Sequence, residues 1–416
     1  MKKTFYLFGE PPFSLSRFLW FFAIPFQFKS IKTALRLFLV FTVVNFKFSA
    51  SAQDSSHLKI SLLTCTPGDQ LYSTFGHTAI RVTDSISLTD YVFNYGSFRF
   101  DDPNFYIKFI RGKLLYYLSV ENFPEFIFDY QAENRGITEQ VLNMDASEKI
   151  ALRDALYENS KEENKFYKYD FFLDNCTTRS RDVLVRYKKD HPGFKPVMPE
   201  GTRFRQAIHE YLDKNQKYWS KLGIDLLLGA PTDAVMTTAQ SQFLPDNLMK
   251  SFDSSNQAHP LVLSTTGLYA VNQDKNKGTL FTPMTVFALL LAVITLLSFS
   301  PNVKIKNFLQ GFDGLLFFFT GLLGILFIFM WTGTDHSMTK SNYNLLWAWP
   351  THILAAYYVN RKNKWARMYF GLNTAFLIII LLIWAFLPQQ LNVALIPFVL
   401  LLAFRSARKF LPAFAN

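Results

Sequence analysis

Hydrophobic and polar positions are distributed differently in the two halves of the chain. From residue 280 onward, apolar stretches follow one another at 281–299, 311–331, 345–360, 369–387 and 391–404. The first, second and fourth are long enough to cross the hydrocarbon core of a bilayer as helices, whereas the third and fifth are shorter. The pattern predicts an all-helical membrane domain of about five transmembrane helices over residues 276–416.

The preceding region, residues 53–275, mixes polar and apolar positions in the manner of a folded soluble domain. The segments "HTAIRVTD" and "DYVFNYGSF" alternate and are separated by a polar turn, which predicts two paired strands. A further strand is predicted at "GITEQVLNM". Asp145 with Glu148 three residues later forms a capping-box pattern, which predicts a helix from there. Another helical pattern follows Cys176, and a helical region is predicted at about 201–228.

Composition and charge support a mixed membrane and soluble chain. The sequence is 50% hydrophobic and 17% aromatic, too apolar for an ordinary soluble protein. Its net charge of +11 is compatible with nucleic-acid binding, but basic residues gather beside the apolar stretches, in "NVKIKN", "NRKNKWAR" and "RSARKF". The segment "PQQLN" carries no charge. By the positive-inside rule, the three basic segments and the C-terminus are cytoplasmic and the soluble domain is external, so no nucleic-acid partner is expected.

The N-terminus has the pattern of an export signal. Basic residues precede the apolar run Leu37–Val44, and small residues at Ala50 and Ala52 form a cleavage pattern before Gln53. We therefore predict a leader over residues 1–52 that is cleaved on export. An additional apolar stretch, "RFLWFFAIPFQF", leaves two alternatives open, a retained anchor and a start assigned too early.

One of only two cysteines lies in the segment "YDFFLDNCTTRSRD". The pattern places Cys176 at the start of a helix, with Asp174 or Asn175 as the cap. Main-chain N–H groups and the helix dipole at that position lower the pKa of a thiol, and the same N–H groups can stabilise an oxyanion. Arg179, about one turn further on, adds positive potential. Two alternatives remain, a buried inert cysteine and, in an oxidising compartment, a Cys65–Cys176 disulfide.

A cysteine nucleophile needs a base, and His77 in "LYSTFGHTAIRV" is the candidate. It begins a predicted strand, and Gly76 before it allows close approach of another main chain. Asn94, on the next strand, is placed to hold the imidazole in one tautomer. A structural histidine at 77 and a turn cap at Asn94 before Gly96 are the alternatives.

Together these motifs resemble a known family. The order of "GHTAIRV", "FNYG" and "DNCTTRSRD" is similar to that of the circularly permuted, papain-like NlpC/P60 superfamily, which includes lecithin:retinol-acyltransferase-like enzymes. More closely, the chain resembles the Lnb family of lipoprotein N-acyltransferases of Bacteroidetes-type bacteria. The matching segments are "LTCTPGDQLYSTFGHTAIRV", "YVFNYGSFRFDDPNFYIKFIRGKLLYYL", "YDFFLDNCTTRSRD", "GAPTD", "QFLPDNL" and "TDHSMTKSNYNLLWAWPTHIL". They cover most of residues 58–360.

The resemblance implies an α+β fold, in which a permuted papain-like periplasmic domain with an antiparallel sheet precedes the membrane helices in the bacterial inner membrane. It implies that Cys176 accepts an acyl chain from a phospholipid and passes it to the α-amino group of the lipidated N-terminal cysteine of an apolipoprotein. His77 then acts as the base and Asn94 orients it. No cofactor and no metal are implied.

Further residues in the matching segments are candidates for substrate binding or support: Tyr72, Arg179, Asp182, His336, Asn344 and His352. The last three belong to "TDHSMTKSNYNLLWAWPTH", where polar residues at membrane depth favour a role in lipid headgroup or substrate contact. An interfacial loop with Trp347 and Trp349 as an aromatic belt is the alternative. A metal site formed by Asp335, His336 and His352 is a further alternative.

Two other functions share the same dyad or shell. A membrane-anchored thiol hydrolase, either a phospholipase or a peptidoglycan or peptide amidase of NlpC/P60 type, uses Cys176 and His77 but resolves the thioester with water. An envelope scaffold with a papain-like shell needs neither residue.

Overall fold

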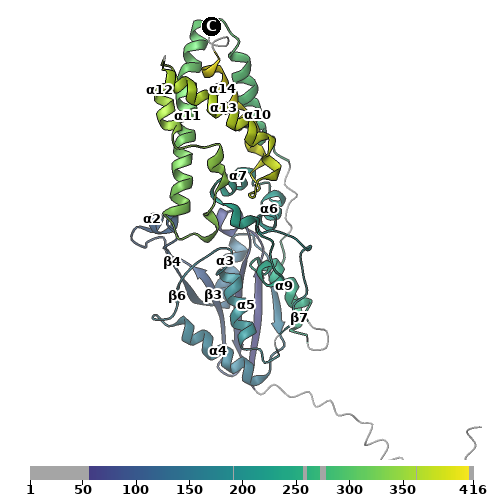
Figure 1. Cartoon of the computed structure of the whole chain (residues 1–416). Coiled ribbons are helices and arrows are strands. Elements are labelled where there is room, and N and C mark those ends of the chain that lie inside the picture. Colours follow the sequence, from purple (N-terminus) through teal and green to yellow (C-terminus); the bar gives the residue numbers. More distant parts are fainter. Residues whose placement is uncertain (1–55, 191, 256–259, 272–277, 362, 412–416) are drawn as a thin grey trace, which may run out of the picture. The chain divides into compact units, whose positions relative to one another are not determined.

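Seven antiparallel strands form one sheet in the order β6-β4-β3-β2-β1-β5-β7 (Figure 1). The computed structural model describes residues 56–190, 192–255, 260–271, 278–361 and 363–411, so the predicted leader lies outside the described residues. The strands are β1 Leu58–Cys65, β2 His77–Asp84, β3 Thr89–Ser97, β4 Leu115–Asn122, β5 Ile137–Leu142, β6 Phe166–Lys168 and β7 Val262–Tyr269. The three predicted strands are confirmed as β2, β3 and β5.

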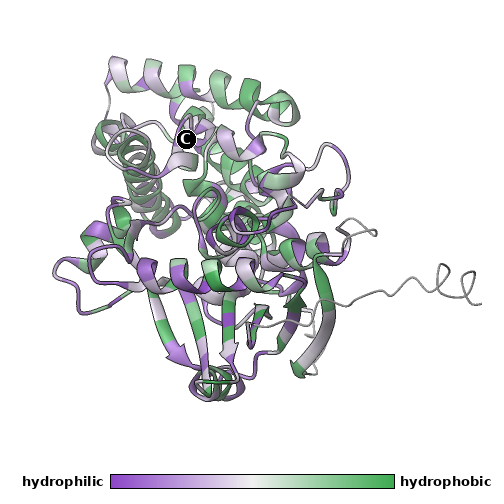
Figure 2. Cartoon of the chain, turned by 90° about the horizontal axis from the view of Figure 1, so that it is seen from below, coloured by the Kyte–Doolittle hydropathy of each residue, from purple (hydrophilic) through white to green (hydrophobic). Residues whose placement is uncertain are grey.

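Both faces of the sheet are covered. Ile80, Val82 and Phe93 pack on one face in a cluster that includes residues of α4 (Ala146–Ser160), α5 (Cys176–Arg186) and α9 (Pro245–Asp253). Ala79 and Val92, at alternating positions, pack on the other face in a cluster that includes residues of α3 (Phe123–Ala132). The strands accordingly carry bands of hydrophilic and hydrophobic residues (Figure 2). The register is fixed by this alternation, since a slip of one residue would exchange the two faces.

The helices of this region follow the local signals, with one difference. They are α2 Phe105–Ile110, α3 Phe123–Ala132, α4 Ala146–Ser160, α5 Cys176–Arg186, α6 Phe204–Lys214, α7 Tyr218–Leu227, α8 Thr238–Ser241 and α9 Pro245–Asp253. The capping box of Asp145 and Glu148 is confirmed at the start of α4. The helical region predicted at 201–228 is divided into α6 and α7, because Gln216 adopts a positive φ of 53° and the Lys217 N–H returns to the Leu212 carbonyl.

The C-terminal region is helical. Its helices are α10 Pro283–Leu297, α11 Val303–Thr332, α12 His352–Tyr358, α13 Lys364–Leu382 and α14 Ile396–Phe410. Within the described residues, α11 and α13 are long and apolar enough to cross a membrane, and α10 is a shorter apolar helix. The stretch 345–360 contains the end of a 3-10 helix and the 7-residue helix α12. The number of spans therefore stays a prediction.

Charged groups inside this helical region are paired. Arg405 of α14 is 3% exposed and donates from Nε to Asp313 of α11 at 2.6 Å. Lys409 adds a second cation to the same carboxylate at 2.7 Å. Pairing offsets the high cost of a charge in an apolar environment, so these contacts tie α11 to α14.

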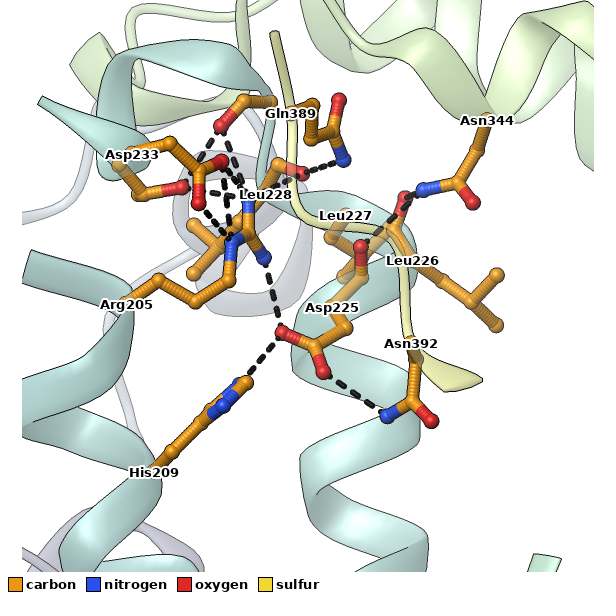
Figure 3. Close-up of polar contacts among 12 residues, drawn as sticks. Arg205, His209, Asp225, Leu226, Leu227, Leu228, Asp233, Asn344, Gln389 and Asn392 are labelled. Carbon is orange, nitrogen blue, oxygen red and sulfur yellow. Dashed lines mark hydrogen bonds and ion pairs between the residues drawn. The ribbon is translucent and has the colours of Figure 1, made fainter. Parts of the chain in front are cut away.

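A network of hydrogen bonds and ion pairs centred on Arg205 joins helices α6 and α7, called the α6–α7 layer, to the C-terminal region (Figure 3). The Arg205 side chain is fully buried and pairs with Asp225 at 2.8 Å and Asp233 at 3.0 Å. The other Asp225 oxygen accepts from Asn392 at 2.8 Å, and Asn344 donates to the Asp225 carbonyl at 3.1 Å. Residues of the "GAPTD" segment and of two C-terminal loops therefore meet at one buried guanidinium.

Breaking this network is expected to be strongly destabilising. Asp225→Ala removes one carboxylate from a buried guanidinium, which typically costs about 3–5 kcal/mol. The measurement is the free energy of unfolding of the full chain in detergent. Asp213→Ala is the matched control on α6, because Asp213 is 47% exposed in its pair with Lys221 and such pairs contribute at most about 1 kcal/mol. Equal losses in the two variants would contradict the role of the network.

Candidate active site

Cys176 is the first residue of α5, and Asn175 is the cap of that helix. The Asn175 Oδ1 atom accepts from the Thr177 and Thr178 N–H groups at 2.9 and 2.8 Å. Its Nδ2 donates to the Phe171 carbonyl at 2.8 Å. The alternative cap, Asp174, instead pairs with Arg179. Since Asn175 uses two N–H groups of the first turn, these are not available to an oxyanion, contrary to the simple expectation from the helix start.

The His77 side chain and the Cys176 thiol line the same cavity, and they contact each other closely enough for each to shift the pKa of the other. His77 is the first residue of β2 and lies opposite Cys65, the last residue of β1, so the contact is made at the end of these strands. The Thr78 and Thr177 hydroxyls are 3.1 Å apart and connect β2 directly to α5. These contacts position the thiol and the imidazole from two elements that are separated by about a hundred residues in the sequence.

A second hydrogen bond of the imidazole determines its tautomer. His77 Nε2 lies 2.5 Å from Asn94 Oδ1, and Asn94 Nδ2 donates to the Glu121 carboxylate at 2.9 Å. A carboxylate only accepts, so it fixes the orientation of the amide, and Asn94 Oδ1 must then accept the proton of Nε2. Nδ1 is therefore the ring nitrogen left to exchange a proton with Cys176. Glu121, which orients Asn94, was not among the site residues predicted from the sequence.

The environment favours the ion pair of thiolate and imidazolium. Burial raises the pKa of the Cys176 thiol, but His77, the Thr78 N–H and the Thr177 hydroxyl outweigh it and lower the pKa to about 7. Burial lowers the pKa of His77, but Cys176 and the hydrogen bond to Asn94 outweigh it and raise the pKa. A thiol that ionises near neutral pH is a competent nucleophile.

Gly76 permits the close approach of β2 to β1 at this site. Its φ is +82°, and a Cβ there would lie 2.7 Å from the Cys65 carbonyl oxygen. The expectation that this glycine allows close main-chain contact is therefore confirmed.

Gly76→Ala is expected to lower the free energy of unfolding by about 1–3 kcal/mol and to displace His77. The displacement is measured as a higher pH midpoint for alkylation of Cys176. Gly201→Ala is the matched control, because Gly201 also has a φ of +82° but a Cβ there has no atom within 4 Å. If both variants showed the same pH midpoint for alkylation of Cys176, the close contact between residue 76 and Cys65 would not be what positions His77.

The thiol opens into an apolar cavity of about 330 Å³. Its walls include the aromatic side chains of Tyr72, Phe75, Phe98, Phe109, Tyr116 and Phe171. His336, which follows α11, also lines it. The His336 ring donates to the Ile110 carbonyl at 3.0 Å, and the Asp335 N–H donates to the Arg111 carbonyl at 2.9 Å. The loop after the long apolar helix α11 therefore contributes to the cavity that holds Cys176.

Comparison with known families agrees with this arrangement. Residues 46–197 match the family described as the Lnb N-terminal periplasmic domain. Residues 274–414 match the family described as the Lnb transmembrane domain. The chain belongs to the Lnb family. As an Lnb protein it is a membrane protein with a periplasmic portion, and the family suggests an enzyme that modifies lipoproteins. Neither a curated protein nor a solved structure matches the chain.

Within this Lnb chain, the supporting residues named from the sequence separate into two groups. Tyr72 and His336 line the thiol cavity. Arg179 does not line it; its guanidinium pairs with Asp174 at 2.6 Å and lies 3.5 Å from the centre of the Tyr167 ring. Asp182 is 60% exposed at its side chain and pairs with Arg181.

Asn344 and His352 are packing residues of the Lnb helical region and do not line the cavity. Asn344 accepts from the Trp347 indole at 3.0 Å. His352 is fully buried and lies 2.7 Å from the Tyr369 hydroxyl. Trp347 is also fully buried, so it is not part of an aromatic belt. Within the described ranges, no three His, Cys, Asp or Glu side chains come together as metal ligands.

The second cysteine has a structural role. Both cysteines are free thiols, which excludes the disulfide alternative in this structure. Cys65 is fully buried in the cluster between the sheet and α3. Burial raises the pKa of its thiol to about 12, so it stays protonated at neutral pH.

Proposed function

We propose that this protein is a lipoprotein N-acyltransferase that uses Cys176 as its nucleophile. It moves an acyl chain from a membrane phospholipid, through a thioester, to the α-amino group of the lipidated N-terminal cysteine of an apolipoprotein. The observation that carries the proposal is the pairing of a low-pKa thiol with His77 in an apolar cavity partly walled by His336, which follows α11. Membership of the Lnb family supports the same reaction class.

In the first half-reaction, the Cys176 thiolate attacks the ester carbonyl of the phospholipid. A C–S bond forms and the C–O ester bond breaks. The departing alkoxide takes the proton from the His77 imidazolium and leaves as a lysophospholipid. The raised pKa of His77 keeps this proton on the ring until the alkoxide develops.

In the second half-reaction, the α-amino group attacks the thioester carbonyl. A C–N bond forms, the C–S bond breaks, and neutral His77 takes the proton that the amine loses. The products are an amide and the regenerated thiolate–imidazolium pair. Asn94, held by Glu121, keeps Nδ1 of His77 directed at the reacting atoms in both halves.

Exclusion of water favours transfer over hydrolysis. Cys176 is only 7% exposed, and aromatic side chains form much of the cavity wall. Both substrates carry acyl chains, so they lie in the membrane, and a catalytic domain joined to membrane helices meets them there. We further propose that the sheet and α5 form a permuted papain-like fold. From the charge pattern we also propose that the protein lies in the inner membrane with its C-terminus in the cytoplasm.

The test uses the full chain in nanodiscs with an isotope-labelled phospholipid and a diacylated lipopeptide. We expect mass spectrometry to detect the labelled N-acyl lipopeptide and one equivalent of lysophospholipid per amide. Release of free fatty acid without N-acylation would instead identify a thiol hydrolase.

A further inference from the structure

A second cavity of about 300 Å³ adjoins the thiol cavity. The two share the side chains of Leu71, Phe75, Phe109, Phe171 and His336 as lining. Beyond this shared wall, the second cavity is lined by Ile208 of α6, Ile224 of α7, Leu228 and Met338, among others. Its apolar walls therefore begin at the catalytic cavity and continue between the α6–α7 layer and the loop that follows α11.

The polar side chains of this second cavity are already engaged. Asp170 accepts from the Phe172 N–H at 2.9 Å and from the Ser337 hydroxyl at 2.5 Å. His336 and Thr339 bond to main-chain carbonyls of α2 and α11 at 3.0 and 2.8 Å. A ligand in this cavity is consequently contacted mainly by apolar atoms.

We propose that the second cavity binds the hydrocarbon chain of the acyl donor and measures its length. This inference rests on the function proposed above, because the chain must be the one esterified to Cys176. A peptide would bury N–H and C=O groups without partners there, at a cost of a few kcal/mol per group, whereas a hydrocarbon chain has none to satisfy. The wall formed by Met338 and Thr339 follows α11, which is long and apolar enough to lie among the lipid chains of a bilayer.

Ile224 and Leu228 are the residues at which length selection can be changed. Both are half-buried, so larger side chains can be introduced there with less strain than at Ile208, which is 1% exposed. Ile224→Trp and Leu228→Trp are expected to exclude the end of a long chain. For each methylene group that no longer fits in the cavity, the use of that acyl chain relative to shorter chains should fall by about fourfold. Ile224→Ala is expected to shift use toward longer chains.

The experiment supplies the full chain in nanodiscs with phospholipids of several chain lengths in competition. Mass spectrometry then gives the chain-length distribution of the N-acylated lipopeptide. Leu227→Trp is the matched control, because Leu227 is on the same helix, is half-buried, and lines neither cavity. We expect opposite shifts for Ile224→Trp and Ile224→Ala and the unmodified distribution for the control. Unchanged distributions in all variants would overturn the inference.

A second measurement uses the unmodified protein and does not depend on turnover. A phospholipid with a photoreactive group at the end of its acyl chain is expected to label peptides that contain residues 204–228 or 337–339. Labelling confined to other segments would count against the cavity as the chain site. If the wild-type protein labels there but transfers no acyl group, the proposed function fails and the chain site stands.

Discussion

Replacing Cys176 with serine is expected to lower N-acylation by at least about 10³-fold and to abolish the covalent acyl-enzyme. A serine hydroxyl keeps the size of the side chain, but the arrangement around it is suited to a thiolate whose pKa is about 7. The measurement combines the rate of lipopeptide acylation with the intact mass of the protein after incubation with phospholipid. The wild-type protein should gain one acyl chain that hydroxylamine removes.

Cys65→Ala is the control for this substitution. Cys65 is also buried and free, but burial holds its thiol in the protonated form. This variant should keep both the activity and the acyl adduct. Full activity in Cys176→Ser, or an acyl adduct on Cys65, would contradict the proposed mechanism.

Replacing His77 with glutamine is expected to move the ionisation of Cys176 to higher pH. In the wild-type protein the rate of alkylation by iodoacetamide should rise with pH through a midpoint near 7, because the thiolate is the reactive form. Without the cation at position 77, burial is no longer outweighed and the midpoint should lie at or above the ordinary value of 9.0. At pH 7 the alkylation rate should then fall by roughly fivefold or more, because the smaller thiolate fraction outweighs the higher nucleophilicity of a more basic thiolate.

The same variant should lose acyl transfer, because no group remains to carry the proton between alkoxide, amine and thiol. General acid–base catalysis typically contributes about 10²–10⁴-fold. His57→Gln is the control, since His57 is exposed. Its alkylation curve should overlay that of the wild-type protein. An unshifted midpoint in His77→Gln would mean that another group lowers the pKa of Cys176.

Some features of this Lnb protein are determined by short stretches of its sequence. The limits of β2 and β3, the capping box at Asp145 and the start of α5 at Cys176 depend on alternation and on side chains within a few residues. The identity of the chemically useful residues is also visible locally, because a cysteine at a helix start and a histidine at a strand start have recognisable surroundings. Runs of apolar residues likewise indicate the helical C-terminal region.

Other features were decided only by the tertiary structure. Glu121 accepts a hydrogen bond from Asn94 because β3 and β4 pair in a register that places Asn94 opposite Ser119. Neither strand specifies this register alone. The segment that contains Asn344 and His352 had the composition of a binding loop. In the structure, however, Asn344 donates to the main-chain carbonyl of Asp225 on α7, and His352 bonds to Tyr369 on α13. Local patterns report the conformation of a few neighbouring residues. Which polar group meets which, and which is left to face a substrate, depends on contacts between distant segments that form only when the whole chain packs.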